Sequence, residues 1–120
     1  MALRFDPDKS RVSKCTKTEF IDGTIEEDIL SVPGVGDAAA ARLAKRGVNN
    51  TYQFIGVYLG LRENDMDSVA HHDAFVNFLN KAGITNCRHG IVDAIAQKVS
   101  TMIPGLYDIE AIRASLDEHK

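Results

Sequence analysis

One short segment of the sequence has residue types and spacing suited to binding an anion through the protein backbone. In Val32-Pro33-Gly34-Val35-Gly36, two glycines flank a valine, and four consecutive alanines follow shortly afterwards. Glycines carry no Cβ, so the chain can turn tightly and an anion can approach the main chain. If a helix begins here, the N–H groups of Gly36, Asp37 and Ala38 have no partner within it and are free to meet the anion. The segment therefore predicts a phosphate-binding turn.

The residues on either side of this turn complete a known pattern. Apolar Ile29 and Val32 precede it, and Ala40 and Leu43 follow it, which resembles the helix-hairpin-helix motif of proteins that bind the DNA backbone. We expect Val35 to point into the core and fix the turn. A glycine-rich turn that only packs two helices is the alternative, and the carboxylate of Asp37 is unfavourable for anion binding. Basic residues on the next helical turns favour DNA contact: Arg42, Lys45 and Arg46.

The elements that must position this segment are helical. Apolar residues recur at helical spacing from residue 24 onward, and no stretch alternates with a period of two for long enough to predict a strand. We expect helices at about 25–31 and 37–46, a third capped near residues 49–51, a fourth ending at Gly83, a fifth capped by Thr85 or Asn86, and a terminal helix at 107–118. The predicted fold is all-α, a compact five-helix SAM-like or helix-hairpin-helix domain over residues 19–103. Residues 1–18 are expected to be a flexible basic tail, with a short helix near Lys14–Ile21, and residues 104–120 a C-terminal helical extension.

Composition and charge limit the classes of function. A chain of 120 residues with 44% apolar residues is long enough for one domain with its own core. The net charge of −3 argues against a general polyanion binder, but the charges are segregated along the chain. Residues 1–18 carry five basic and two acidic residues, residues 19–33 carry five acidic ones, and residues 34–62 carry four basic and one acidic. Binding to phosphates depends on the potential within a Debye length of ~8 Å, so a basic face is compatible with an acidic total.

From Lys14 to Ile103 the chain resembles the barrier-to-autointegration factor family of small chromatin-associated DNA-bridging proteins. The strongest part of the resemblance runs from Val32 through Gly47 and continues to Tyr52, Gly56 and Arg62. The resemblance implies a five-helix fold, a homodimer, double-stranded DNA as the ligand, and bridging of duplexes without sequence preference. It also implies a location in the nucleus and cytoplasm and leaves nuclear-envelope or chromatin proteins as possible partners. A cellular and a viral origin both stay open.

By position, the resemblance and the motif together give a set of expected DNA contacts. Most lie in the turn and in the helix after it, one lies at the end of the third helix, one at the start of the fifth, and two in the N-terminal tail. The resemblance also implies regulation of the tail by phosphorylation, for which Ser13 and Thr16, among its basic residues, are the candidate sites. The expected contacts are Gly34, Val35, Gly36, Ala38, Arg42, Lys45, Arg46, Arg62, Arg88, Lys14 and Lys17.

Other classes of site find little support in the sequence. The neighbouring pairs Cys87/His89 and His71/His72 lack the ligand spacing of zinc sites, and we expect a buried Cys87 with histidines on the surface. No catalytic constellation, metal or cofactor is predicted, and neither is membrane insertion, since no stretch approaches the ~20 apolar residues of a span. Two cysteines are not a disulfide framework, which favours a reducing, intracellular location. The alternatives to DNA bridging are a SAM-like protein-interaction domain and a non-enzymatic helix-hairpin-helix subunit of a DNA repair or replication complex.

Overall fold

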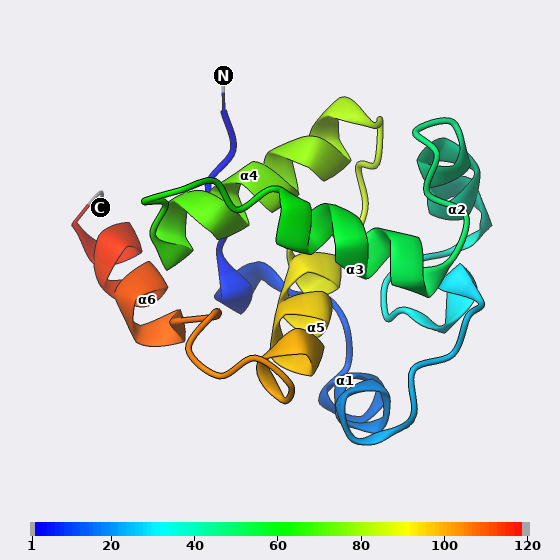
Figure 1. The fold of residues 1–120 in the computed structure, drawn as a ribbon, viewed down its shortest axis with the longest axis horizontal. Helices are drawn as coiled ribbons and strands as arrows, with labels where there is room; N and C mark the ends of the chain where they lie inside the picture. The colour runs from blue at the N-terminus through cyan, green and yellow to red at the C-terminus, as the bar shows by residue number, and fades with distance from the viewer. Residues whose placement is uncertain (1, 119–120) are drawn as a thin grey trace.

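The protein is helical throughout the part of the chain that the structure describes. The structure, a computed structural model, describes residues 2–118. None of these residues forms a β-strand (Figure 1), which confirms the all-α expectation. In chain order the elements are η1 (Pro7–Lys9), α1 (Lys14–Asp22), η2 (Ile29–Ser31), α2 (Asp37–Ala44), α3 (Thr51–Gly60), α4 (Ser68–Lys81), α5 (Arg88–Ser100) and α6 (Ile109–Asp117).

Helix α5 lies at the centre of the molecule, and the other elements pack around it (Figure 1). Its residues Ile91, Ile95 and Val99 have almost no exposed surface, because α1, α3, α4 and η1 all contact it. Even its lysine, Lys98, is buried, and the ammonium donates hydrogen bonds to the carbonyl oxygens of Ile21 and Gly23 at the end of α1. The apolar residues of α5 are therefore core, and the exposed Met102 lies beyond its end.

The helix starts fall into two groups. Four α-helices begin at a side chain that accepts a hydrogen bond from a backbone N–H of the first turn, as good N-caps do. The other two, α2 and α5, begin at Gly36 and Cys87, where no side chain makes such a bond within the described residues. The first N–H groups of α2 and α5 are therefore left for another partner. The four side-chain caps are Ser13, Asn50, Asp67 and Asp108.

The N-terminal segment corrects the expectation of a flexible tail over residues 1–18. Met1 lies outside the described residues, but Phe5 is 1% exposed and belongs to the hydrophobic core. The N–H groups of Leu3, Phe5 and Asp6 donate to side chains of α4 and α5, at 2.7–3.1 Å. Burial of one aromatic ring and three anchored backbone groups outweighs the polar character of the segment. Only the part that becomes α1 had a predicted helix.

Two further expectations change. In place of the helix expected at 25–31, the structure has only the short η2. Asp28 accepts a hydrogen bond from the Leu30 N–H and so starts a short turn there. The histidines expected on the surface, His71 and His72, are completely buried, because α3 and the segment before α6 cover that face of α4.

The C-terminal helix is confirmed. Helix α6 packs on α4 through the buried Ile112, and the N–H of Asp108 donates to the Ser68 hydroxyl at 2.9 Å. Residues 119 and 120 of the expected extension lie outside the described residues. Figure 1 shows α6 at the opposite end of the molecule from α2. Within residues 2–118, none of the helices combines the length and the apolar character that crossing a membrane requires.

Candidate nucleic-acid interface

The glycine turn before α2 is docked against the start of α5. Gly34 has φ of +91°, a backbone conformation that residues with a Cβ rarely adopt, and the Val35 N–H donates to the Val32 carbonyl at 3.0 Å. A Cβ on Gly34 would lie 2.8 Å from Cγ1 of Ile91, so the space for it is already occupied. Val35 is buried, as expected. The turn therefore has one fixed geometry, and Gly34 is required both for its dihedral angle and for its packing.

Gly36 occupies a different environment. Its φ is −101°, which any residue adopts, it is exposed, and a Cβ built on it would have no atom within 4 Å. The start of α2 faces a recess of about 370 Å³. Exposed Ala38 on the first turn leaves room for a ligand beside the main chain, whereas the carboxylate of Asp37 at the same place opposes an anion. The residues that line the recess are Gly34, Gly36, Asp37, Ala38, Ala39, Arg42, Gly83, Ile84, Thr85 and Asn86.

Arg42 supplies a positive charge to this recess. Its side chain lies across Gly83, with Nη1 2.6 Å from where a Cβ of Gly83 would stand. Gly83 has φ of +89° in the turn between α4 and α5, so this turn also needs a glycine. The missing Cβ leaves space for the guanidinium, which lines the same recess as the residues at the start of α2. The recess thus combines unpaired helix N–H groups with one guanidinium, the chemistry of a phosphate site.

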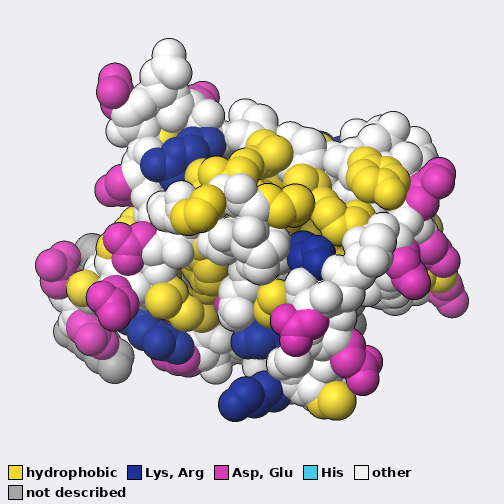
Figure 2. Space-filling view, turned by 60° about the horizontal axis from the view of Figure 1, so that its bottom comes forward, with side chains coloured by type: hydrophobic (Ala, Val, Ile, Leu, Met, Phe, Trp, Pro, Cys, Tyr) yellow, Lys and Arg dark blue, Asp and Glu magenta, His cyan; other side chains and the backbone are white. Residues whose placement is uncertain are grey.

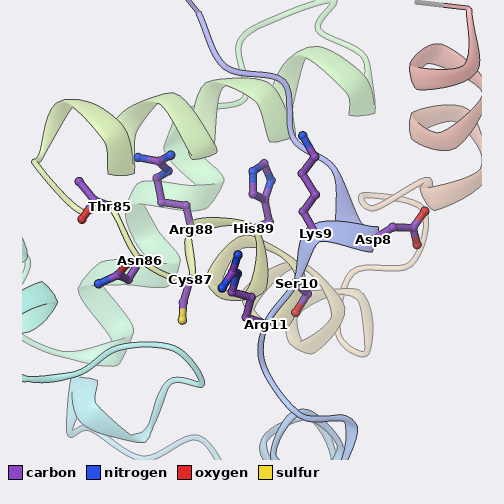
Figure 3. Close-up of a pocket in the computed structure, with 9 residues that line it drawn as sticks. All are labelled: Asp8, Lys9, Ser10, Arg11, Thr85, Asn86, Cys87, Arg88 and His89. Carbon is purple, nitrogen blue, oxygen red and sulfur yellow. The ribbon is translucent and has the colours of Figure 1, made fainter. Parts of the chain in front are cut away.

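A larger recess of about 970 Å³ adjoins the first at the start of α5 (Figure 3). Arg88 lines it and is held in place, because its Nη1 donates to Oδ1 of Asn80 at 2.9 Å and to the Ile84 carbonyl at 3.1 Å. His89 accepts a hydrogen bond from the Asp6 N–H, and its burial, with the nearby Lys9 charge, lowers its pKa. The full lining is Asp8, Lys9, Ser10, Arg11, Thr85, Asn86, Cys87, Arg88 and His89.

The remaining basic residues of the expected set lie outside both recesses. Lys14, Lys45 and Arg62 are exposed, while the Arg46 guanidinium donates to the Lys81 carbonyl at 2.6 Å. Lys17 forms an ion pair of 2.9 Å with the buried carboxylate of Asp93. Its ammonium therefore has a structural partner inside the chain, which the sequence did not indicate.

The expected phosphorylation sites begin α1. The Ser13 hydroxyl oxygen accepts from the Thr16 N–H at 3.1 Å, and its O–H donates to the Thr16 hydroxyl at 2.8 Å. Both side chains are exposed. A phosphate here would stand at a helix N-terminus, where negative charge is stabilised.

The residues that line the recesses and were not expected as contacts include Lys9, Arg11, Thr85 and Asn86. Lys9 and Arg11 were assigned to a flexible tail, and Thr85 and Asn86 were considered only as caps for α5. Gly83, between Ala82 and Ile84, signals a second tight turn. That this turn lies against the start of α2 depends on tertiary packing, which the local sequence does not indicate. For Lys9 and Arg11 the available signal was Leu3 and Phe5, an alternating apolar pair upstream that anchors the segment.

A buried cluster of polar groups lies elsewhere in the fold. Tyr58, His71, His72 and Asp93 are each at most 2% exposed, so no substrate can reach them without opening the core. His72 donates from Nδ1 to the Ser68 carbonyl at 2.7 Å and accepts at Nε2 from the Tyr58 hydroxyl at 2.6 Å. These bonds satisfy the ring, and we assign the cluster to the core.

Comparisons of the chain with protein-family models, with curated proteins and with solved structures found no match. The site is therefore interpreted from its geometry and charge. Among residues 2–118, no group of three or more histidine, cysteine, aspartate or glutamate side chains comes together in a way that could hold a metal ion.

Proposed function

We propose that this chain binds the phosphate backbone of double-stranded DNA at the start of α2 and bridges two duplexes as a homodimer. The observation that carries the proposal is the uncapped start of α2, which opens on a recess beside the exposed Gly36 and the Arg42 guanidinium. Backbone N–H groups and a guanidinium contact phosphates without reading bases, so binding is independent of sequence. The resemblance to the barrier-to-autointegration factor family supports the same ligand, and with it a five-helix SAM-like core of α1–α5 extended by α6.

The alternative class is a SAM-like protein-interaction domain, in which the glycine turn only packs helices. Two observations favour it: the Asp37 carboxylate beside the recess, and the exposed apolar side chains Tyr52 and Leu59 on α3. A non-enzymatic helix-hairpin-helix subunit of a repair or replication complex would share the DNA site but not the bridging. A direct binding experiment separates the first class from the second.

The decisive variant is Gly36→Glu. A carboxylate at this position blocks the phosphate and repels it, and the loss of even one charge-assisted hydrogen bond of roughly 1.5–3 kcal/mol weakens binding more than tenfold. The fold should persist, because the backbone of Gly36 is extended and its Cβ position is open. Fluorescence anisotropy with a labelled random duplex measures the affinity, and circular dichroism on the same sample measures the fold.

Two control variants sharpen this test. Gly36→Ala adds a Cβ without charge and should bind within a few-fold of wild type, at a cost of about 0.5 kcal/mol in stability as a poorer N-cap. Arg42→Ala removes one charge and leaves the N–H groups in place, so it should give an intermediate loss. A folded Gly36→Glu protein that binds duplex like wild type would contradict a DNA site at the start of α2 and favour the protein-interaction alternative.

The salt dependence of binding reports the number of phosphates contacted. With about five phosphates neutralised per site, log K should fall with log salt at a slope of about −4 to −5. Titrations of two unrelated duplexes at several salt concentrations measure it. A slope near zero, or a strong preference between the duplexes, contradicts backbone binding.

A further inference from the structure

The two recesses share one wall. Thr85 and Asn86, in the turn between α4 and α5, line both the recess at the start of α2 and the larger one at the start of α5. In Figure 3, Asn86 and Thr85 stand to one side of Arg88, and Lys9 and Arg11 stand to the other. A ligand that leaves the first recess across this turn therefore enters the second.

The larger recess is basic, and its charge comes from segments far apart in the sequence. Lys9 and Arg11 arrive from the N-terminal segment and Arg88 from α5. Within the described residues, neither Lys9 nor Arg11 forms an ion pair with an acidic side chain. The one carboxylate in the lining, Asp8, pairs with Arg113 of α6 at 3.1 Å, so part of its charge is already compensated.

The segment that carries Lys9 and Arg11 is held in place on both sides. Upstream, Phe5 is in the core and the Asp6 N–H is bonded to His89. Downstream, Val12 packs over Gly90 so closely that a Cβ on Gly90 would lie 2.7 Å from Cγ2 of Val12. A charge on an anchored backbone loses less conformational freedom on binding than one on a mobile tail. The two side chains are therefore presented as part of a preformed surface.

We propose that the larger recess is a second phosphate-binding site that extends the first, so that one duplex backbone runs from the start of α2 across Thr85 and Asn86 to Lys9 and Arg11. This rests on the proposed function, and it adds the N-terminal segment to the interface as a folded wall. Cations that extend from Arg42 through Arg88 to Lys9 suit a polyanion better than a single phosphate ion.

The test is the double variant Lys9→Ala/Arg11→Ala, measured by the salt dependence of duplex binding. Removing one basic side chain from a phosphate makes the slope of log K against log salt shallower by about 0.9, so the expected change is roughly two, with about tenfold weaker binding at moderate salt. Lys9→Arg/Arg11→Lys keeps both charges and should keep the wild-type slope. Lys81→Ala removes an exposed charge that lines neither recess and should also keep it. Thermal melting of each variant tests whether the N-terminal segment stays packed. If the double variant melts at a lower temperature, the single variant Arg11→Ala replaces it, with an expected change in slope of about one.

The outcomes separate this inference from the proposed function. An unchanged slope in Lys9→Ala/Arg11→Ala, with binding still lost in Gly36→Glu, overturns the extended site and leaves the first site standing. Full binding in Gly36→Glu overturns the proposed function itself. Tight binding of inorganic phosphate in calorimetry, abolished by the double variant while duplex binding is unaffected, would show a small-anion site and overturn the continuous track.

Discussion

The histidine pair of α4 shows how single residues couple the core to pH. His72 is fully buried, and its burial, more than any neighbouring charge, lowers its pKa from 6.5 to about 4. His71 is also buried and its pKa is lowered for the same reason, while its Nε2 donates to the Tyr58 carbonyl at 2.7 Å. A second proton on His72 would occupy Nε2, the atom that accepts from the Tyr58 hydroxyl. Both rings are therefore held neutral. The charges and titratable groups that act on them are Arg62, Asp93 and each other.

This predicts acid destabilisation in a defined window. Since the folded pKa of His72 lies below the unfolded value, the stabilisation is fully present above pH 6.5 and is lost as the pH falls toward about 4. For His72 alone the loss between pH 7.5 and pH 5 is about 2 kcal/mol. Urea unfolding at the two pH values measures it. His72→Gln should be less stable at pH 7.5 but lose less on acidification, and an equal loss in both proteins would exclude His72 as the cause.

At the scale of single residues, the sequence predicts the features that depend on residues close by in the chain. Gly34, Val35 and Gly36 could be assigned because a two-glycine turn before a helix has few conformations. The burial of His71 could not, since it depends on Tyr58 from α3 stacking on the ring at 4.5 Å between centroids. The ion pair of Lys17 with Asp93 spans 76 residues, and no local pattern reports such a distance.

At the scale of elements, the start of α1 carries the two candidate phosphorylation sites, so their effect on DNA binding can be tested there. It packs on α5, its start is capped by Ser13, and Lys14 on its first turn is exposed. Added negative charge at this start lies close in sequence to Arg11 and Lys14, and Arg11 lines the recess proposed to bind the duplex. The effect on DNA binding is electrostatic, because α1 stays folded with an acidic cap.

We therefore predict that Ser13→Asp/Thr16→Glu weakens duplex binding by roughly three- to tenfold at low salt, since charge-changing modifications of this kind oppose phosphate contacts. Ser13→Asn/Thr16→Gln is the matched neutral control, and Asn is an equally good N-cap. Anisotropy titrations compare the two, and circular dichroism checks helix content. If both variants bind with the same affinity, charge at the start of α1 does not influence DNA binding.

The two ends of the chain show the limit of element prediction. The periodicity of residues 107–118 indicated α6, but not that it would face the N-terminal segment. Arg4 donates to the Ser115 hydroxyl at 2.6 Å and forms an ion pair with Asp73 at 3.1 Å, so it links α4 and α6. The expected cap of α5 at Thr85 or Asn86 falls short of the observed one, because Cys87 takes a left-handed conformation with φ of +61° that its residue type does not suggest.

At the scale of the whole molecule, the basic recesses and the exposed apolar side chains lie on different parts of the surface. The two recesses proposed to bind phosphate (the phosphate track) lie where α2, the α4–α5 turn and the N-terminal segment meet. The face seen in Figure 2 instead shows apolar side chains gathered in a band, with acidic groups toward both the left and the right of the view. Tyr52 and Leu59 on α3, and Met102 and Ile103 beyond α5, are exposed by 38–57%. Clustered apolar side chains of this size mark association surfaces.

The last prediction is that this apolar surface holds two chains together and that bridging depends on it. Exposed Gly56 and Gly60 have nothing within 4 Å of a Cβ position, so α3 of a second copy can approach closely. Tyr52→Arg/Leu59→Glu should give a monomer at micromolar concentration in analytical ultracentrifugation, while Ala70→Glu, an exposed change on α4, should not. The monomer keeps its phosphate track and binds one duplex, but it loses the avidity of two linked sites and cannot aggregate DNA. A wild-type protein that sediments as a monomer and never condenses DNA rules out bridging, because a single track on a single chain can hold only one duplex.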